Sequence, residues 1–287
     1  MGYFGVVGGD RRQLYAARSL EKRGWNVLLA GWEQGEGTEG LHQVSLEEVG
    51  RQCENVLLPL PVTRDGLMLH APFSQAPIPL GDGFARLLSR CRVFVGMAEK
   101  LQATSSLWQQ IPLLDYAARE EMALGNAFLT AEGAIALAVE KIPGGLWGSR
   151  CLVTGFGRIG KALCLDLRGM GAQVACCARK PWDLTAIRAL GCKALTYEEM
   201  DGPYSVIFNT VPAPVLGERA LSRQSEGTVL LELASAPGGI DREAARRWNV
   251  PVIDAPSLPG KYSPKASGEL IVEAVYHMLH EERRNLQ

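Results

Sequence analysis

The residues best placed to do chemistry form a glycine-rich turn just past the middle of the chain. Residues 153–160 read VTGFGRIG, so that Gly155, Gly157 and Gly160 have the spacing G-x-G-x-x-G. An apolar run precedes this turn and a helical pattern follows it, and in that context the spacing predicts dinucleotide binding. The first glycine allows a tight turn, the second lets the backbone approach a pyrophosphate, and the third permits helix–strand packing. The alternative is a degenerate domain of this type that holds no nucleotide.

The end of the next predicted strand indicates which dinucleotide binds. A site for NAD has an Asp or Glu at that point, where it holds the ribose 2′-hydroxyl. This chain instead reads Cys177-Ala178-Arg179-Lys180, and the guanidinium of Arg179 could bind a 2′-phosphate. The sequence therefore predicts NADP(H). The alternative is that both cations are solvated loop charges.

Loops that follow the later strands of this half should reach the same cofactor, because ligands bind outside the carboxyl ends of parallel strands. Each loop by itself is more often turn chemistry than a ligand contact. The predicted cofactor-binding residues are Gly155, Phe156, Gly157, Arg158, Ile159, Gly160, Ala178, Arg179, Lys180, Asn209, Thr210, Val211, Pro212, Leu233, Ala234 and Ser235.

A second turn, near the N-terminus, carries charged residues where a strand gives way to a helix. Residues 8–13 read GGDRRQ, and backbone N–H groups beside cations at such a turn favour an anion. The third glycine spacing is missing, so we expect a carboxylate-bearing substrate rather than a second nucleotide. Asp10, Arg12 and Gln13 are the predicted substrate-binding residues here. The alternative is an exposed helix start with Asp10 as its N-cap.

Two more segments carry candidate side chains, residues 126–133 (NAFLTAEG) and residues 258–265 (LPGKYSPK). The two lysines of the second segment lie beside a predicted helix start, which makes them a candidate clamp for a dicarboxylate together with Arg12. From the first segment we expect side chains that order the substrate, although Thr130 with Gly133 could equally be a capping arrangement. The predicted catalytic residues are Thr130, Glu132 and Lys265, and the further predicted substrate-binding residues are Asn126 and Lys261.

Strands and helices alternate along the whole chain, which positions these segments. Strands are expected at 3–7, 26–30, 56–60, 92–96 and 113–115, and then at 149–154, 173–177, 205–209, 228–233 and 250–254. The pattern predicts an α/β fold with two doubly wound, parallel-sheet (Rossmann-like) domains separated by a cleft with linking helices. The expected parts are a substrate-side domain at 1–128, a hinge helix and linker at 129–145, an NADP-binding domain at 146–264, and a C-terminal helix at 265–287 that returns to the first domain.

Composition excludes several classes of protein. The 287 residues are 47% hydrophobic and 21% charged with a net charge of −1, so no basic surface for nucleic acid or anionic membrane is expected. No run of 18 apolar residues and no signal peptide is recognised, which predicts a cytoplasmic protein. The seven cysteines form no C-x-x-C pair and the four histidines do not cluster with them. We therefore expect buried, reduced thiols and no metal site.

Taken together and in order, the motifs resemble a known family. They are GGDxRQ at 8–13, TxEG at 130–133, GxGRxG at 155–160, NTxP at 209–212, LASxPGG at 233–239 and LPGxxxPK at 258–265. This set is similar to the A subunit of dipicolinate synthase from spore-forming bacteria over nearly the whole chain. One departure is Ala236, at a position where a basic residue is expected in many members, which puts a substrate contact from that loop in doubt.

The resemblance implies an NADP-dependent oxidation of dihydrodipicolinate to dipicolinate, on a branch of lysine biosynthesis, in the mother cell during sporulation. It also implies the flavoprotein-like B subunit of dipicolinate synthase as partner, and we expect a homo-oligomer. Because the product is aromatic, the reaction needs positioning more than a strong acid–base pair.

Two other functions are compatible with the sequence. One is a different NADP-dependent dehydrogenase, of shikimate or hydroxy-acid type. A hydroxy-acid enzyme would use a histidine near the last strand of the cofactor domain, yet no histidine lies between His70 and His277. The other is a non-catalytic protein that senses NADP(H) on behalf of a partner.

Overall fold

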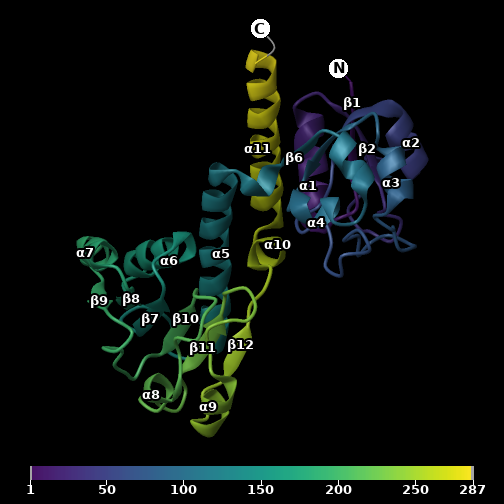
Figure 1. Cartoon of the computed structure of the whole chain (residues 1–287). Coiled ribbons are helices and arrows are strands. Elements are labelled where there is room, and N and C mark those ends of the chain that lie inside the picture. Colours follow the sequence, from purple (N-terminus) through teal and green to yellow (C-terminus); the bar gives the residue numbers. More distant parts are fainter. Residues whose placement is uncertain (1, 286–287) are drawn as a thin grey trace. The chain divides into compact units, whose positions relative to one another are not determined.

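The computed structural model describes residues 2–285 and contains two six-stranded sheets, each in its own compact unit (Figure 1). Unit 1 comprises the chain up to Asn126 together with the segment that starts at Pro264. Unit 2 comprises residues Ala127–Ser263. The C-terminal helix therefore belongs to the same unit as the N-terminal strands.

The sheet of unit 1 has the strand order β3-β2-β1-β4-β5-β6, and all its pairings are parallel. Its strands are β1 (Tyr3–Val7), β2 (Asn26–Ala30), β3 (His42–Gln43), β4 (Cys53–Leu57), β5 (Arg92–Val95) and β6 (Leu113–Asp115). Its helices are α1 (Arg11–Lys22), α2 (Leu46–Gln52), α3 (Asp82–Leu87), α4 (Ala98–Gln102) and α11 (Pro264–Asn285), with short 3-10 turns at Ser106–Gln110 and Tyr116–Ala118.

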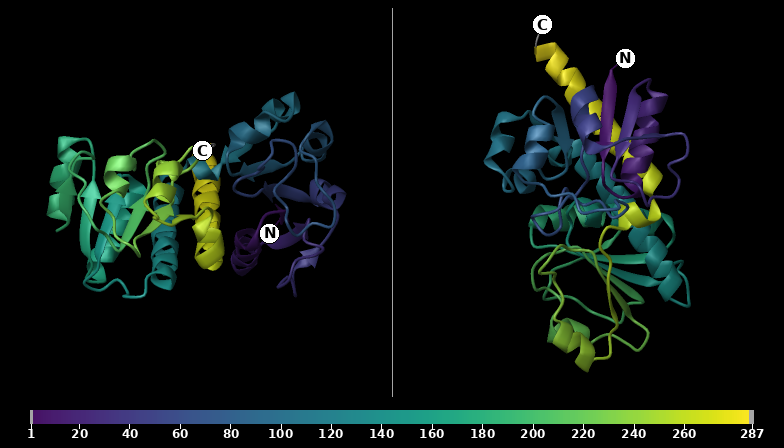
Figure 2. Two further views of the ribbon diagram at one scale, coloured as in Figure 1. Left: turned by 90° about the horizontal axis from the view of Figure 1, so that it is seen from below. Right: turned by 90° about the vertical axis from the view of Figure 1, so that its right-hand side faces the viewer.

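Helices cover both faces of this sheet. Successive side chains of a strand point to opposite faces, and the side chains on both faces are buried. On one face, Phe4 and Leu29 pack with α1 and with Ile271 of α11. On the other face, Val7 and Val56 pack against α2, α3 and the fully buried Trp108. Helix α11 runs beside α1 (Figure 1 and Figure 2). The contact requires a glycine at position 268, because a Cβ there would lie 2.4 Å from the carbonyl oxygen of Arg12.

Unit 2 repeats the same topology with the order β12-β11-β10-β7-β8-β9, again all parallel. Its strands are β7 (Arg150–Thr154), β8 (Gln173–Cys177), β9 (Lys193–Leu195), β10 (Val206–Asn209), β11 (Val229–Glu232) and β12 (Val252–Asp254). Its helices are α6 (Arg158–Gly169), α7 (Pro181–Ala189), α8 (Glu218–Leu221), α9 (Arg242–Arg247) and α10 (Leu258–Tyr262). Numbered within each unit, both sheets have the order 3-2-1-4-5-6, which confirms the predicted doubly wound α/β class.

One long helix, α5 (Glu120–Lys141), leads from unit 1 into unit 2. The sequence predicted a hinge helix and linker at 129–145, and the helix begins nine residues before that segment. Within residues 2–285 it is the one helix long and apolar enough to cross a membrane, but half of its most apolar window is buried inside the protein. Ala131, Ala134 and Ile135 lie in the core of unit 2, so core packing accounts for its composition.

The strand expected at 56–60 lies at Cys53–Leu57 instead. Pro59 and Pro61 lie just beyond the strand and have no N–H to donate, so regular pairing does not continue past this point. All seven cysteines are buried and unbridged. Burial raises the pKa of Cys151 to about 12, and burial, with the charge of Cys91 as a smaller cause, raises the pKa of Cys53 to about 12. These thiols are therefore protonated at neutral pH.

Candidate functional site

The glycine turn between β7 and α6 has the backbone geometry of a pyrophosphate loop. Gly155 has φ +92°, the left-handed region that favours glycine. A Cβ at Gly155 would lie 2.7 Å from Thr210 Oγ1, and a Cβ at Gly160 would lie 2.1 Å from the carbonyl oxygen of Gly155. Both positions are therefore closed to larger residues by the turn itself.

Gly157, between them, is different. It is the N-cap of α6 in an extended conformation, and a Cβ there would meet no atom within 4 Å. The first turn of α6 also holds no acidic residue. An open backbone face at the start of a twelve-residue helix is suited to an anionic group, because the N–H groups and the helix dipole both point there.

A buried polar network joins the carboxyl ends of three neighbouring strands beside this turn. Thr154 at the end of β7 donates through Oγ1 to Asn209 Oδ1 over 2.5 Å. Asn209 at the end of β10 donates through Nδ2 to Glu232 Oε1 over 2.6 Å. Thr154 and Asn209 are fully buried and Glu232 is 6% exposed. The network therefore lies in the interior of unit 2, below the turn.

The same network fixes two loops. Glu232 accepts hydrogen bonds from the backbone N–H of Ala234 (3.0 Å) and Gly239 (2.9 Å). Asn209 bonds both ways with Val211, accepting from its N–H at 3.2 Å and donating to its carbonyl oxygen at 3.0 Å. The loops after β10 and β11 are thus held to the buried carboxylate of Glu232, at the edge of the sheet where ligands bind in this fold.

Thr154 and Glu232 are not among the site residues predicted from the sequence. The available signal was positional, since each is the polar last residue of an apolar strand, RCLVT and VLLE. Their pairing is between distant parts of the chain, and the local sequence does not contain it.

At the end of β8 the two predicted cations are exposed and Ala178 is buried. The ammonium of Lys180 lies 5.3 Å from the ring centroid of Trp182. Arg179 makes no hydrogen bond or ion pair within residues 2–285. Its guanidinium is therefore available to an anion. No Asp or Glu lies between the end of β8 and Arg179 in the sequence.

The remaining predicted cofactor residues lie on the same carboxyl edge of unit 2. Phe156 is buried, with the ammonium of Lys161 at 5.3 Å from its ring centroid. Thr210 donates through Oγ1 to the carbonyl oxygen of Thr154 over 2.7 Å. Exposed members are Arg158, Pro212 and Ser235, and half-buried members are Ile159, Thr210, Val211, Leu233 and Ala234.

The N-terminal turn of unit 1 is a self-contained helix cap. Asp10 accepts from the N–H of Arg12 (3.0 Å), while the N–H of Asp10 donates to Gln13 Oε1 (3.1 Å), which makes a capping box. The guanidinium of Arg12, 6% exposed, donates to both oxygens of Asp10 (2.9 and 2.8 Å) and to the carbonyl oxygen of Leu60 (2.5 Å). Burial raises the pKa of Asp10, but the hydrogen bonds and charge of Arg12 lower it more, so it lies below its usual value.

Other donors of this turn are also used internally. The N–H of Gly8 donates to the carbonyl oxygen of Ala30 (2.9 Å) and that of Gly9 to the carbonyl oxygen of His70 (2.7 Å). The segment around His70 covers the turn, since a Cβ at Gly8 would lie 2.8 Å from Leu69 Cδ2. Asp10 is the N-cap, as in the helix-cap alternative, but the helix start is covered rather than exposed. Substrate binding by Asp10, Arg12 and Gln13 stays a prediction.

The predicted residues of α5 are separated on its surface. Thr130 is buried and Glu132 is exposed, as expected for positions two apart on a helix. The pKa of Asp166 on α6 is raised by burial and, secondly, by the charge of Glu132. The Glu132 carboxylate therefore lies on the side of α5 that is nearer to α6. Asn126 lies one turn before Thr130, so these two share a face.

Lys261 and Lys265 are exposed, the first on α10 of unit 2 and the second in the first turn of α11 in unit 1. The ammonium of Lys261 lies 5.0 Å from the ring centroid of Tyr262. Neither lysine forms an ion pair in the part of the chain that the structure describes. Each ammonium could therefore bind a carboxylate.

Comparisons with known proteins agree with the family resemblance of the motifs. The sequence profile of the N-terminal domain of the dipicolinate synthase A subunit matches residues 3–117. The chain is 28% identical to the A subunit of dipicolinate synthase from Bacillus subtilis over 282 residues, covering 96% of this chain and 95% of that protein. Its fold matches the crystal structure of the same Bacillus subtilis protein with a TM-score of 0.83 and 27% identity, over 99% of this chain and 97% of that one.

Two further structures extend the comparison. The crystal structure of the dipicolinate synthase A subunit from Bacillus halodurans has a TM-score of 0.83 at 26% identity and covers 97% of both chains. A transhydrogenase from Sinorhizobium meliloti has a TM-score of 0.66 at 16% identity, over 95% of this chain and 92% of that one, which shows likeness of fold.

Proposed function

This chain belongs to the family of dipicolinate synthase A subunits, and we propose that it oxidises dihydrodipicolinate to dipicolinate with NADP+ as the hydride acceptor. The observation that supports this most strongly is the extent of the similarity, which covers 96% of the chain and so includes both units. A glycine turn whose middle position is open toward a ligand supports the use of a dinucleotide.

The reaction removes two hydrogens from the ring. Bound NADP+ would supply the hydride acceptor, so that one hydrogen would leave a ring carbon with its electron pair and the other would leave as a proton to solvent or to a nearby base. The ring becomes aromatic, so the driving force lies in the substrate. The protein then has to bind the dicarboxylate, orient the hydridic carbon and exclude water.

NADP+ is favoured over NAD+ by the residues after β8. Arg179 is exposed and has no internal partner in the described chain, so its guanidinium can bind the 2′-phosphate bidentately. Lys180 adds a second positive charge. We propose that the loops held by Asn209 and Glu232 bind the nicotinamide end, since both leave the same sheet edge as the glycine turn.

For the substrate, we propose that Lys261 and Lys265 bind the two carboxylates, because both ammonium groups are exposed and neither forms an ion pair within residues 2–285. Arg12, with Asp10 and Gln13, would act mainly by holding its turn, since the guanidinium is already engaged. Asn126 and Thr130, on one face of α5, would orient the ring, and Glu132 would act nearer to α6.

The family resemblance further supports a partner, the flavoprotein-like B subunit, and a cytoplasmic role in the mother cell of a sporulating bacterium. We also propose that the chain forms a homo-oligomer.

A kinetic comparison tests the proposal. Dihydrodipicolinate, generated enzymatically, is supplied with NADP+ or NAD+, and the aromatic product is followed by its ultraviolet absorbance. We expect product formation with a kcat/KM for NADP+ at least ~10-fold above that for NAD+. Turnover of shikimate or of a 2-hydroxy acid in place of dihydrodipicolinate would contradict the proposal, as would binding of NADPH without turnover, with or without the B subunit.

A further inference from the structure

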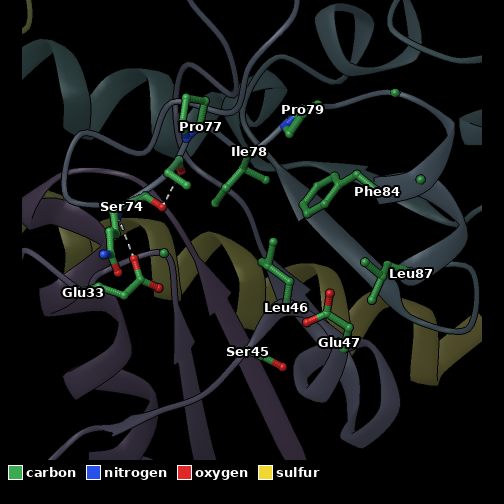
Figure 3. Close-up of a pocket in the computed structure, with 15 residues that line it drawn as sticks. Glu33, Ser45, Leu46, Glu47, Ser74, Pro77, Ile78, Pro79, Phe84 and Leu87 are labelled. Carbon is green, nitrogen blue, oxygen red and sulfur yellow. Dashed lines mark hydrogen bonds between the residues drawn. The ribbon is translucent and has the colours of Figure 1, made fainter.

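Unit 1 contains a cavity that the proposed reaction does not use (Figure 3). Its volume is about 520 Å³, within the ~300–1,000 Å³ range of small-molecule sites. Ile78 and Phe84 lie on one side and Leu46 and Leu87 on the other, and these four apolar side chains face the same space. The carboxylates of Glu33 and Glu47 stand at the rim. All of these residues belong to unit 1.

The cavity lies at the carboxyl ends of β2 and β3. Gly31, which directly follows β2, and Ser45, which follows β3, both line it. In a sheet of order 3-2-1-4-5-6, this edge is where ligands bind, and an acidic residue just after the second strand is the one that holds a ribose hydroxyl. Glu33 follows the end of β2 by three residues. Its place in the topology is therefore that of a ribose-binding carboxylate.

The Glu33 carboxylate can accept further hydrogen bonds. One oxygen, Oε2, accepts from the backbone N–H of Gln75 over 3.0 Å. Burial raises the pKa of Glu33, but this hydrogen bond and others lower it more, so the group is charged at neutral pH. The backbone N–H groups of Gly31 and Glu33 and the hydroxyl of Ser74 also lie near this carboxylate, which has about four lone-pair sites and is exposed at the cavity rim. Two adjacent hydroxyls of a ribose are suited to such an acceptor.

The charge of the rim disfavours anionic ligands. Glu33 and Glu47 would repel a phosphate or a dicarboxylate. The turn that binds a pyrophosphate in related topologies is closed here, because the N–H groups of Gly8 and Gly9 already donate to carbonyl oxygens of unit 1. These features favour a ligand with an apolar ring and hydroxyl groups over one that carries a phosphate.

We propose that this cavity binds an uncharged purine nucleoside, with the base between Ile78, Phe84, Leu46 and Leu87 and the ribose diol on the Glu33 carboxylate. The apolar walls supply contact area for the base, and the carboxylate supplies charge-assisted hydrogen bonds to the sugar. The inference is independent of the proposed reaction, which takes place with a charged cofactor and substrate.

Calorimetric titration of the full chain with adenosine tests the site. The titration uses the Gly157→Leu variant, because a Cβ at Gly157 meets no atom within 4 Å and a larger side chain there should block the cofactor turn of unit 2. In this background we expect one adenosine per chain, with 2′-deoxyadenosine bound at least ~10-fold more weakly. Adding Glu33→Gln should weaken adenosine by a similar factor and abolish the difference between the two nucleosides. Glu47→Gln at the same rim is the matched control and should leave that difference in place.

AMP should bind no more tightly than adenosine. The proposal is overturned if adenosine shows no saturable binding, or if Glu33→Gln leaves the preference for the 2′-hydroxyl intact. It is also overturned if the Gly157→Leu change itself removes adenosine binding, because the binding then belongs to the cofactor turn. Protection of residues 74–79 from hydrogen exchange by the B subunit, with no effect of adenosine, would assign the cavity to a protein partner instead.

Discussion

Asn209 Nδ2 donates a hydrogen bond to Glu232 Oε1 over 2.6 Å, and no cation pairs with that carboxylate in the described part of the chain. The other donors to Glu232 are the backbone N–H groups of Ala234 and Gly239. A buried carboxylate costs free energy unless it is hydrogen-bonded. Here three N–H donors satisfy it, and they tie two ligand-side loops to one side chain.

Glu232→Gln should loosen these loops. The glutamine oxygen can replace Oε1, but its amide NH2 then faces the N–H of Gly239, so two donors oppose each other. We expect a loss of about 1–3 kcal/mol in the free energy of unfolding and a rise in the KM for NADP+ that exceeds any fall in kcat. Urea unfolding and steady-state kinetics measure the two effects. The exposed Glu243→Gln is the control, and equal behaviour of both variants would refute the role of the network.

The glycine turn allows a paired prediction. Gly157→Leu should keep the thermal stability of the wild type, because a Cβ there meets no atom within 4 Å, yet it should abolish NADP+ binding. Gly160→Ala should destabilise unit 2 by about 1–3 kcal/mol or more, because its Cβ would lie 2.1 Å from the carbonyl oxygen of Gly155. Thermal melts with and without NADP+ separate the two outcomes. Strong NADP+ binding by Gly157→Leu would show that the pyrophosphate lies elsewhere.

Arg179 should determine the preference for NADP+ over NAD+. Arg179→Ala is expected to raise the KM for NADP+ by ~10–100-fold and to leave that for NAD+ unchanged, since only NADP+ carries the 2′-phosphate. Arg188→Ala, an exposed arginine on α7, is the matched control. An equal effect of Arg179→Ala on both dinucleotides would mean that this guanidinium does not read the 2′-phosphate.

The ion pair between Asp10 and Arg12 should make the stability of the protein depend on pH. The folded-state pKa of Asp10 is lowered, so the pair stabilises the protein fully above the unfolded carboxyl pKa of about 3.9 and this stability is lost as the pH falls through the folded value. Asp10→Asn leaves the buried Arg12 charge unpaired and should cost about 2–4 kcal/mol at pH 7.

Urea unfolding between pH 2 and about pH 7 measures this difference, which should shrink toward zero at the acid end. The exposed Glu99→Gln should show little change at any pH. A cost of Asp10→Asn that does not depend on pH would assign the stability to helix capping rather than to the ion pair.

Lys265 tests the carboxylate clamp. Lys265→Ala should raise the KM for dihydrodipicolinate by roughly 10-fold through loss of a charge-assisted hydrogen bond, with no effect on the KM for NADP+ or on stability. Lys22→Ala, also exposed and in unit 1, provides the comparison. If Lys265→Ala changed neither KM nor turnover, this lysine would have no part in substrate binding.

Most of the fold follows from local patterns. Strands such as Tyr3–Val7, Asn26–Ala30 and Gln173–Cys177 lie where the apolar runs predicted them, because each is buried in a parallel sheet. The short edge strands His42–Gln43 and Lys193–Leu195 were not predicted. Each has two or three residues with exposed or polar members, so neither periodicity nor hydrophobicity marks them.

The candidate site was predictable only in part. Some of its features depend on residues close together in the sequence, and others depend on contacts between distant parts of the chain. The three glycines act through neighbouring backbone, so their spacing is enough to locate the turn. The pairing of Thr154, Asn209 and Glu232 depends on strand order and register, which local sequence does not specify. The closure of the Gly8–Gly9 turn likewise depends on the distant segment around His70.

The most direct test of the central claim is the stoichiometry of the reaction. Dihydrodipicolinate and NADP+ are mixed with the protein, in the presence and absence of the B subunit, and dipicolinate and NADPH are measured together by absorbance. One NADPH should form for each dipicolinate with the wild-type chain, and neither should form with Gly157→Leu. Dipicolinate formed without NADPH, or no turnover under any of these conditions, would contradict the assignment of this chain as the NADP-dependent dehydrogenase.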